Sequence, residues 1–185
     1  MIPNRDNMVD LTEIQAAYYM VAATGVLVAA AYYIMNLREN RKNMRVTLTN
    51  NIMLNLGTPT GMKQIIELLQ MEWTDYEDFE RKYGTENNLE SAGVRLSLWY
   101  TYNTLGELLR RGLVDENTLY TAMGWGVVST WKKFESVVAE HRRRYMSRDQ
   151  WTGFEYLAGR MLARMKAVDP SYVVPETYDK YIRNK

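Results

Sequence analysis

The stretch AAYYMVAATGVLVAAAYYIM, residues 16–35, decides the organisation of this chain because it contains neither a charged residue nor a proline. The uncharged window extends from Ile14 to Leu37, and a helix of this length measures about 36 Å. A bilayer core of about 30 Å needs roughly 20 predominantly apolar residues. The window therefore predicts a transmembrane helix over residues 14–37.

The charges on either side of the window predict its orientation. Residues 1–13 carry a net charge of −2, whereas residues 38–45 carry +3. Because basic flanks stay on the cytoplasmic side, we expect a short extracytoplasmic N-terminus over residues 1–13 and a cytoplasmic location for the rest, in the cell membrane. The topology-setting residues, which are also expected to meet anionic lipid headgroups, are Arg38, Arg41, Lys42 and Arg45.

Two alternatives to a membrane anchor stay open. A removable signal peptide begins with a basic segment, whereas this chain begins with an acidic one. The core helix of a soluble protein is the other alternative, and the length of the uncharged window disfavours it.

One face of the predicted span carries the small residues Ala22, Gly25 and Ala29. Gly25 and Ala29 form a small-xxx-small pattern, which lets another helix approach closely. We therefore expect the span to pack against other transmembrane subunits. The alternative is that these small residues, which are common in membrane spans, have no such role.

The rest of the chain predicts an all-α fold, with a compact bundle of about five helices after the transmembrane helix. Residues 38–57 continue the helical pattern as a basic juxtamembrane extension, residues 58–168 form the helical cytoplasmic domain, and residues 169–185 form an extended tail. No stretch shows the alternation of a strand between turn signals. The expected N-caps are Thr58, Thr74, Asp115 and Ser147, and the expected core includes Ile65, Ile66, Leu68, Leu69, Leu89, Val94, Leu98, Leu105 and Leu109.

Catalytic and metal-binding chemistry finds no support in the residue pattern. Cysteine is absent and His141 is the only histidine, so a zinc site would need carboxylates as all its other ligands. No phosphate-binding loop, dinucleotide fingerprint or nucleophile elbow occurs. We expect no catalytic residue, no cofactor and no metal site. A net charge of +1 also disfavours nucleic acid as a partner.

Tryptophan, tyrosine and glycine supply the other leads. Core packing is the ordinary role of aromatic residues, but Trp and Tyr also concentrate binding energy at interfaces. The interface candidates are Trp99, Trp125, Trp131 and Trp151. Gly124 and Gly126 lie within a predicted helix, where each costs about 1 kcal/mol relative to alanine, so close approach of another helix is expected there.

Three segments together resemble a known family. They are LLRRGLVDE (Leu108–Glu116), the region around Trp131, and WTGFEYLAGR (Trp151–Arg160). In this order, after a basic juxtamembrane run, they resemble a family of short single-span bacterial and archaeal proteins catalogued as domain of unknown function 4760, over roughly residues 15–165. The resemblance implies a membrane-tethered helical domain and no assigned activity.

Three functions remain after these observations. The first is a non-catalytic, single-pass accessory or stabilising subunit of a larger membrane complex. The second is a membrane-tethered sensor that binds a small ligand or phosphate, which a buried polar pocket at Arg95, Arg110 or Arg111 would favour. The third, an enzyme, would require a cleft with a carboxylate pair of raised pKa.

Overall fold

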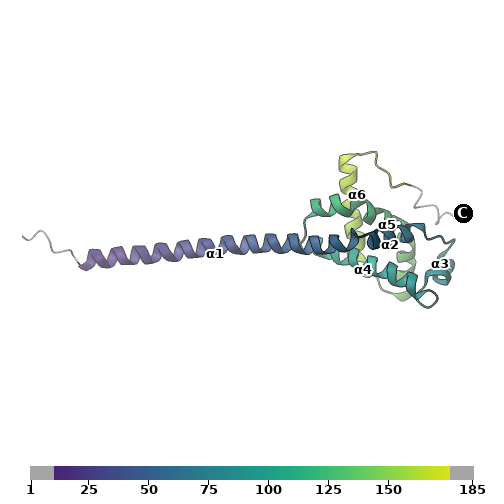
Figure 1. The fold of residues 1–185 in the computed structure, drawn as a ribbon, viewed down its shortest axis with the longest axis horizontal. Coiled ribbons are helices and arrows are strands. Elements are labelled where there is room, and N and C mark those ends of the chain that lie inside the picture. The colour runs from purple at the N-terminus through teal and green to yellow at the C-terminus, as the bar shows by residue number, and fades with distance from the viewer. Residues whose placement is uncertain (1–10, 176–185) are drawn as a thin grey trace, which may run out of the picture. The chain divides into compact units, whose positions relative to one another are not determined.

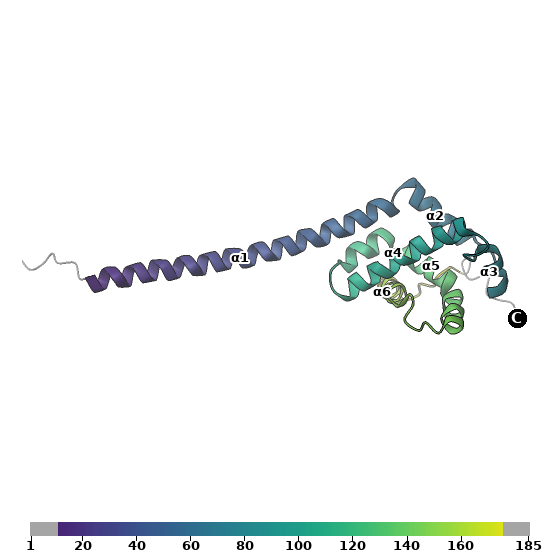
Figure 2. The same cartoon turned by 90° about the horizontal axis from the view of Figure 1, so that it is seen from below.

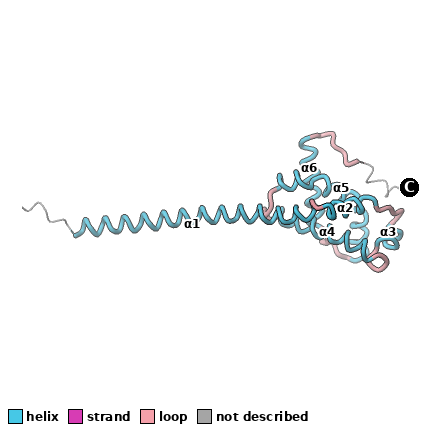
Figure 3. Tube along the Cα trace, in the orientation of Figure 1, coloured by secondary structure: helices cyan, strands magenta, loops and turns pink. Residues whose placement is uncertain are grey.

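The computed structural model describes residues 11–175, except for the side chains of residues 45, 48, 49 and 52–56. Within this part the chain forms six helices and no strand (Figure 1, Figure 3), so the all-α prediction is confirmed. The helices are α1 (Leu11–Leu56), α2 (Pro59–Gln70), α3 (Tyr76–Tyr83), α4 (Leu89–Arg110), α5 (Glu116–Tyr145) and α6 (Thr152–Val168).

The chain divides into two units, residues 1–44 and residues 45–185. In the first unit, Leu11–Met44 of α1 is long and apolar enough to cross a membrane, and none of its most apolar window is buried. α1 then continues without a break to Leu56, and the second unit starts at Arg45. Most of the predicted extracytoplasmic segment lies outside the described residues.

The second unit is a helical bundle in which α4 packs most extensively against α6, and α5 also packs against α6. α2 contacts both α4 and α5, and α3 contacts α4; Figure 2 shows these helices from below. Large aromatic side chains fill the space between them. The completely buried ones are Trp99, Tyr102, Phe79, Phe134 and Phe154.

Two expected core residues lie on the surface. Ile66 is 49% exposed because α2 turns Ile65 and Leu68 inward instead. Leu89 is 75% exposed because it is the first residue of α4, directly after the N-cap Asn88. Periodicity predicted the helices correctly but did not fix which neighbouring apolar residue points to the core.

The helix N-termini show why some expected boundaries were right and others wrong. The Thr58 side chain accepts a hydrogen bond from Gly61 N at 3.0 Å, and Asp115 accepts one from Thr118 N at 2.8 Å, as expected for N-caps. Asp75, and not Thr74, caps α3 by accepting from Asp78 N at 2.8 Å. An acidic cap is favourable there because it also meets the positive end of the helix dipole.

The N-terminus of α6 is capped by a side chain from another helix. Ser147 is not its cap, because the chain turns at Trp151 (φ 64°) and no local side chain accepts from the first turn. Asn103 of α4 instead accepts hydrogen bonds from Gly153 N at 2.9 Å and Phe154 N at 3.2 Å. Long-range capping of this kind leaves no local sequence signal.

The closest helix approach occurs at Gly106 and Gly153, not at the expected pair. A Cβ added at Gly106 would lie 1.8 Å from the carbonyl oxygen of Gly153, so α4 and α6 meet there backbone to backbone. A Cβ at Gly124 or Gly126 would instead meet only side chains, at 3.2 Å or more. At Gly124 and Gly126, where close approach of another helix was expected, α6 and α4 contribute only the side chains of Met165 and Tyr102.

Candidate functional site

The small-residue face of α1 is uncovered by any described part of the chain. Ala22, Gly25 and Ala29 are all exposed, and a Cβ built at Gly25 would meet no atom within 4 Å. The neighbouring large apolar side chains are exposed as well, with Val28 at 63% and Leu27 at 70%. An exposed apolar surface of this extent is typical of a contact with a membrane or with another protein.

The basic residues that follow the apolar window are also exposed. Arg38, Arg41 and Lys42 are exposed, and none of them forms an ion pair with a described residue. The side chain of Arg45 lies outside the described side chains. The exposed cations are available to anionic headgroups or to a partner of opposite charge.

The four tryptophans proposed as interface residues separate into two groups. Trp99 and Trp151 are 2% and 4% exposed, and their rings meet edge to face at a centroid distance of 5.5 Å. These two are core residues in this fold, since both belong to the buried hydrophobic cluster of the bundle. Trp125 is 47% exposed and Trp131 is partly buried, so only these two remain accessible to a partner.

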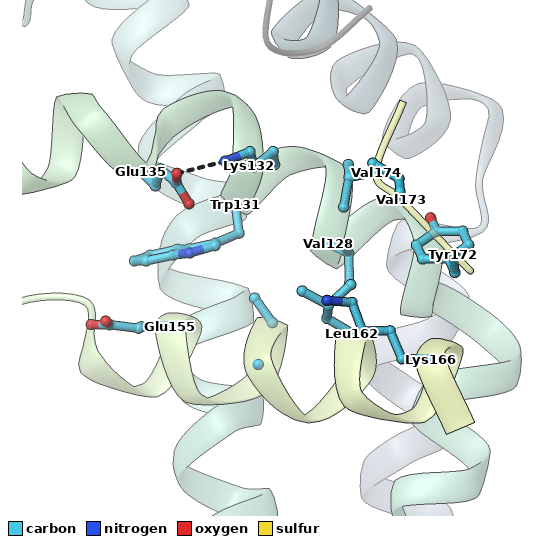
Figure 4. Close-up of a pocket in the computed structure, with 12 residues that line it drawn as sticks. Val128, Trp131, Lys132, Glu135, Glu155, Leu162, Lys166, Tyr172, Val173 and Val174 are labelled. Carbon is cyan, nitrogen blue, oxygen red and sulfur yellow. Dashed lines mark hydrogen bonds and ion pairs between the residues drawn. The ribbon is translucent and has the colours of Figure 1, made fainter. Parts of the chain in front are cut away.

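Trp131 lies in a groove between α5 and α6 with a volume of about 520 Å³. Figure 4 shows its ring above the α6 segment that carries Glu155 and Leu162, and Val128 lines the same groove. Lys132 and Glu135 form an ion pair of 2.8 Å at the rim. The groove thus combines an apolar floor with charged edges, which is the composition of a docking surface.

The C-terminal segment that follows α6 borders this groove. Tyr172, Val173 and Val174 line one end of it (Figure 4), and Tyr172 and Val174 pack against the core. Residues 176–185 of the predicted tail lie outside the described residues. The described start of the tail therefore belongs to the bundle.

Gly124 and Gly126 open a second, more apolar pocket of about 590 Å³. Three methionines, Met62, Met123 and Met165, line it together with Trp125. Methionine side chains adapt to differently shaped surfaces. The two glycines therefore leave space for this pocket beside α5. The backbone of another helix in the bundle does not fill that space.

A third pocket, of about 360 Å³, is lined mainly by charged and polar residues. We call it the Arg95 pocket. It lies between the α3–α4 loop and the α5–α6 loop, and Arg95 and Trp99 of α4 form its inner wall. Its other lining residues are Glu80, Thr85, Glu86, Asn87, Leu96, His141, Tyr145, Gln150 and Trp151.

Arg95 is the dominant charge of this pocket. It is 5% exposed, its Nη2 donates to the carbonyl oxygen of Tyr83 at 3.2 Å, and its guanidinium lies over the rings of Phe79 and Trp99, at 4.8 Å and 5.1 Å. Burial lowers the pKa of Arg95. A buried guanidinium normally has a carboxylate partner, but Arg95 has no ion pair with any described residue.

His141 stands beside Arg95 in the same pocket, with its ring 4.4 Å from that of Tyr145. Burial lowers the pKa of His141 below 6.5, although Gln150 and Glu80 oppose this shift. The imidazole is therefore neutral near pH 7. This neighbourhood could not be predicted from the sequence, because His141 and Arg95 are far apart along the chain.

The last turn of α5 carries a second basic group, Arg142, Arg143 and Arg144. Ion pairs within the bundle neutralise it. Arg144 pairs with Glu77 and with Glu140, and Arg143 pairs with Glu140 at 2.6 Å. Arg142 pairs with Glu155 at 2.8 Å. The pairs with Arg143 and Arg144 hold the carboxyl pKa of Glu140 at about 2, chiefly through the hydrogen bond from Arg143. The group joins helices and offers no open basic surface for nucleic acid among the described residues.

Metal binding has no cluster to support it among the described residues, where no three His, Asp or Glu side chains are placed to share an ion. The carboxyl pKa shifts that the structure resolves are downward, as at Glu77, Asp78 and Asp115, because hydrogen-bond donors stabilise the charged form. A carboxyl group with a raised pKa, which a general acid would need, is not among them.

The fold and these surfaces define a class: an all-α domain that follows a helix long and apolar enough to cross a membrane. A family model described as Domain of unknown function (DUF4760) matches residues 19–161, and the chain belongs to this family. The match confirms the resemblance inferred from the sequence motifs. No curated protein and no solved structure matches the chain.

Proposed function

We propose that this protein is a non-catalytic, single-pass membrane protein that acts as an accessory or stabilising subunit of a larger membrane complex. It docks through α1 and through the surface of its helical domain. The observation that carries the proposal is the exposed small-residue face of α1, where Gly25 has no neighbour within 4 Å.

The composition of α1 supports packing against other helices rather than against lipid alone. Alanine and glycine contribute little to insertion, and four tyrosines, Tyr18, Tyr19, Tyr32 and Tyr33, lie within the apolar window, each more than 60% exposed. A tyrosine hydroxyl at membrane depth needs a hydrogen-bond partner. Neighbouring transmembrane helices supply such partners and fill the space above the small residues.

The helical domain adds a second surface to this proposal. The α5–α6 groove carries Trp131 and an ion-paired rim, and Trp125 is half exposed beside the methionine-lined pocket. Aromatic side chains in such positions anchor protein partners. Two separate docking surfaces would make binding of a membrane subunit stronger than either alone.

The orientation in the proposal is N-terminus outside and helical domain cytoplasmic, in the cell membrane. The exposed cations Arg38, Arg41 and Lys42 support it, because such residues are retained on the cytoplasmic side. They would also contact anionic headgroups.

A matched pair of substitutions tests the docking of α1. Ala29→Leu enlarges the small-residue face, about 40° around the helix from Gly25, whereas Ala30→Leu adds the same side chain about 140° away. Gly25→Leu is a second change on the face. Each variant is expressed at native level, extracted in mild detergent and purified by a C-terminal tag, and the co-purifying membrane proteins are quantified by mass spectrometry.

We expect Ala29→Leu and Gly25→Leu to reduce the co-purifying subunits by at least about tenfold, since a clash at a close helix contact costs more than about 1.4 kcal/mol. Ala30→Leu should retain them. Equal recovery with all three variants would overturn the role of this face.

A second candidate function, a membrane-tethered sensor, is favoured by one specific observation. Arg95 is buried and lines a polar pocket, which is the feature expected of a ligand-binding domain and not required for docking. The two functions are compatible, because the Arg95 pocket shares no lining residue with the α5–α6 groove.

A further inference from the structure

We propose that the Arg95 pocket binds a small zwitterion that carries a carboxylate and an ammonium group, such as a free α-amino acid. This inference rests on the sensor function and does not depend on docking through α1. It differs from a phosphate site, because the charges that line the pocket have both signs.

The carboxylate of the ligand would meet the guanidinium of Arg95. Only one guanidinium hydrogen bond is made within the described residues, to the carbonyl oxygen of Tyr83, and Nε is buried without an acceptor. Two aromatic rings hold the group in place but supply no negative charge. A carboxylate matches the forked guanidinium geometry and would add a counter-charge in direct contact, where Glu80 acts on Arg95 only through space.

Trp99 adds a second donor to the same wall. Its indole Nε1 is buried and donates to no described residue. An indole N–H and a guanidinium can only donate, so both require acceptor atoms. A small movement of these side chains toward a bound carboxylate would satisfy both, which a purely apolar ligand could not do.

The acidic residues that line the pocket determine which chemical group the other end of the ligand carries. Glu80 and Glu86 face the same cavity as Arg95, while burial keeps His141 neutral near pH 7. Two carboxylates would repel a dianion such as phosphate. They would instead attract an ammonium group, which a zwitterion places a few ångströms from its carboxylate.

The size and walls of the pocket fit this class of ligand. A volume of about 360 Å³ is at the lower end of ligand pockets, which run from about 300 to 1,000 Å³. Trp99 and Trp151 provide aromatic surface, while Asn87 and Gln150 provide amides at the loops. The two loops that border the pocket would both contact a bound ligand. Binding would thereby change the conformation of the rest of the domain.

The test uses the full-length protein in detergent micelles, with intrinsic tryptophan fluorescence and calorimetry as readouts. Each of the common L-amino acids is titrated to about 10 mM, a range that detects a dissociation constant of about 1 mM. For any amino acid that binds, its amide and its deaminated acid are titrated as well. Inorganic phosphate is the remaining probe.

We expect saturable binding of at least one amino acid, with loss of binding for its amide and at least tenfold weakening for its deaminated acid. Arg95→Lys should weaken binding at least tenfold, because a point charge replaces the fork, whereas the matched change at the exposed Arg111, Arg111→Lys, should not. Glu80→Gln, at a partly exposed side chain, should weaken the amino acid but not its deaminated acid.

Three results would overturn the inference: no saturable binding to the folded wild-type protein, binding of phosphate in competition with the amino acid, or binding unchanged in both Arg95→Lys and Glu80→Gln. Because the Glu80 side chain is partly exposed, its variant keeps the test valid even if Arg95→Lys unfolds. None of these results affects the recovery of partner subunits, so docking and ligand binding fail separately.

Discussion

At the residue scale, Gly106 and Gly153 carry the closest contact of the bundle. Substitution of either by alanine forces backbone atoms apart, because the new Cβ would lie 1.8 Å or 2.3 Å from a carbonyl oxygen of the facing helix. We expect each variant to lose about 3 kcal/mol or more of the free energy of unfolding, the upper range for overpacking. Chemical denaturation of the micelle-bound protein, followed by circular dichroism, measures this loss.

Gly159 of α6, the helix that also carries Gly153, provides the matched control. It lies on an exposed side of α6, and a Cβ there would meet no atom within 4 Å. Gly159→Ala should therefore leave stability unchanged or raise it by about 0.5–1 kcal/mol through helix propensity. If all three alanine variants behave alike, α4 and α6 do not meet as described.

His141 makes a prediction about pH at the same scale. Its folded pKa is below the unfolded value of 6.5, chiefly through burial, so the unfolded chain binds more protons as the pH falls through that value. The contribution of His141 is therefore complete above about pH 6.5 and is lost as the pH falls toward its folded pKa. We expect the Tm to drop over this window in the wild-type protein and to drop less in His141→Gln. A slope of equal steepness in both would refute the assignment.

At the element scale, the cap of α6 shows how the bundle is tied together. Asn103 accepts two backbone N–H groups from the first turn of α6, and a helix start needs such acceptors. Asn103→Ala should cost about 1–2 kcal/mol, the range for a lost N-cap. Asn103→Asp keeps the acceptor and adds a charge that suits the helix N-terminus, so it should recover most of the loss. Equal losses for both variants would mean that packing, and not capping, is the role of Asn103.

Local signals in the sequence predicted the elements but not their mutual contacts. Thr58 with Pro59 and Asp115 identified two helix starts, because capping acts within three residues. Asn103 could not be identified as a cap, because its partners lie 50 residues or more along the chain. The same limit applies to Gly153. The sequence shows that it lies near a helix start, but not that Gly106 of α4 lies opposite.

The candidate sites divide in the same way, into those formed by contiguous residues and those assembled by the fold. The apolar window and the basic cluster of α1 are contiguous, so the sequence predicts them directly. The Arg95 pocket draws on α3, α4, α5 and two loops, and the sequence could name Arg95 as a candidate but not His141 or Glu80 as its neighbours. The tryptophans were ambiguous because burial depends on which helix face packs, which propensity does not determine.

At the scale of the whole molecule, the orientation across the membrane is the first prediction. We expect a C-terminal tag to be cleaved by protease in inside-out vesicles and protected in right-side-out vesicles, since the exposed cations Arg38, Arg41 and Lys42 keep their side cytoplasmic. Replacing these three and Arg45 by glutamine should give a mixed orientation. The opposite protection pattern in the wild-type protein would contradict the proposed topology.

The most direct test of the docking function is the mass of the wild-type protein extracted from its native membrane. Native gel electrophoresis and native mass spectrometry in mild detergent would compare the particle with the 21.7 kDa chain. We expect a particle that contains this chain together with other membrane subunits in a fixed stoichiometry. A mass equal to one chain, or to a small multiple of this chain alone, would contradict it.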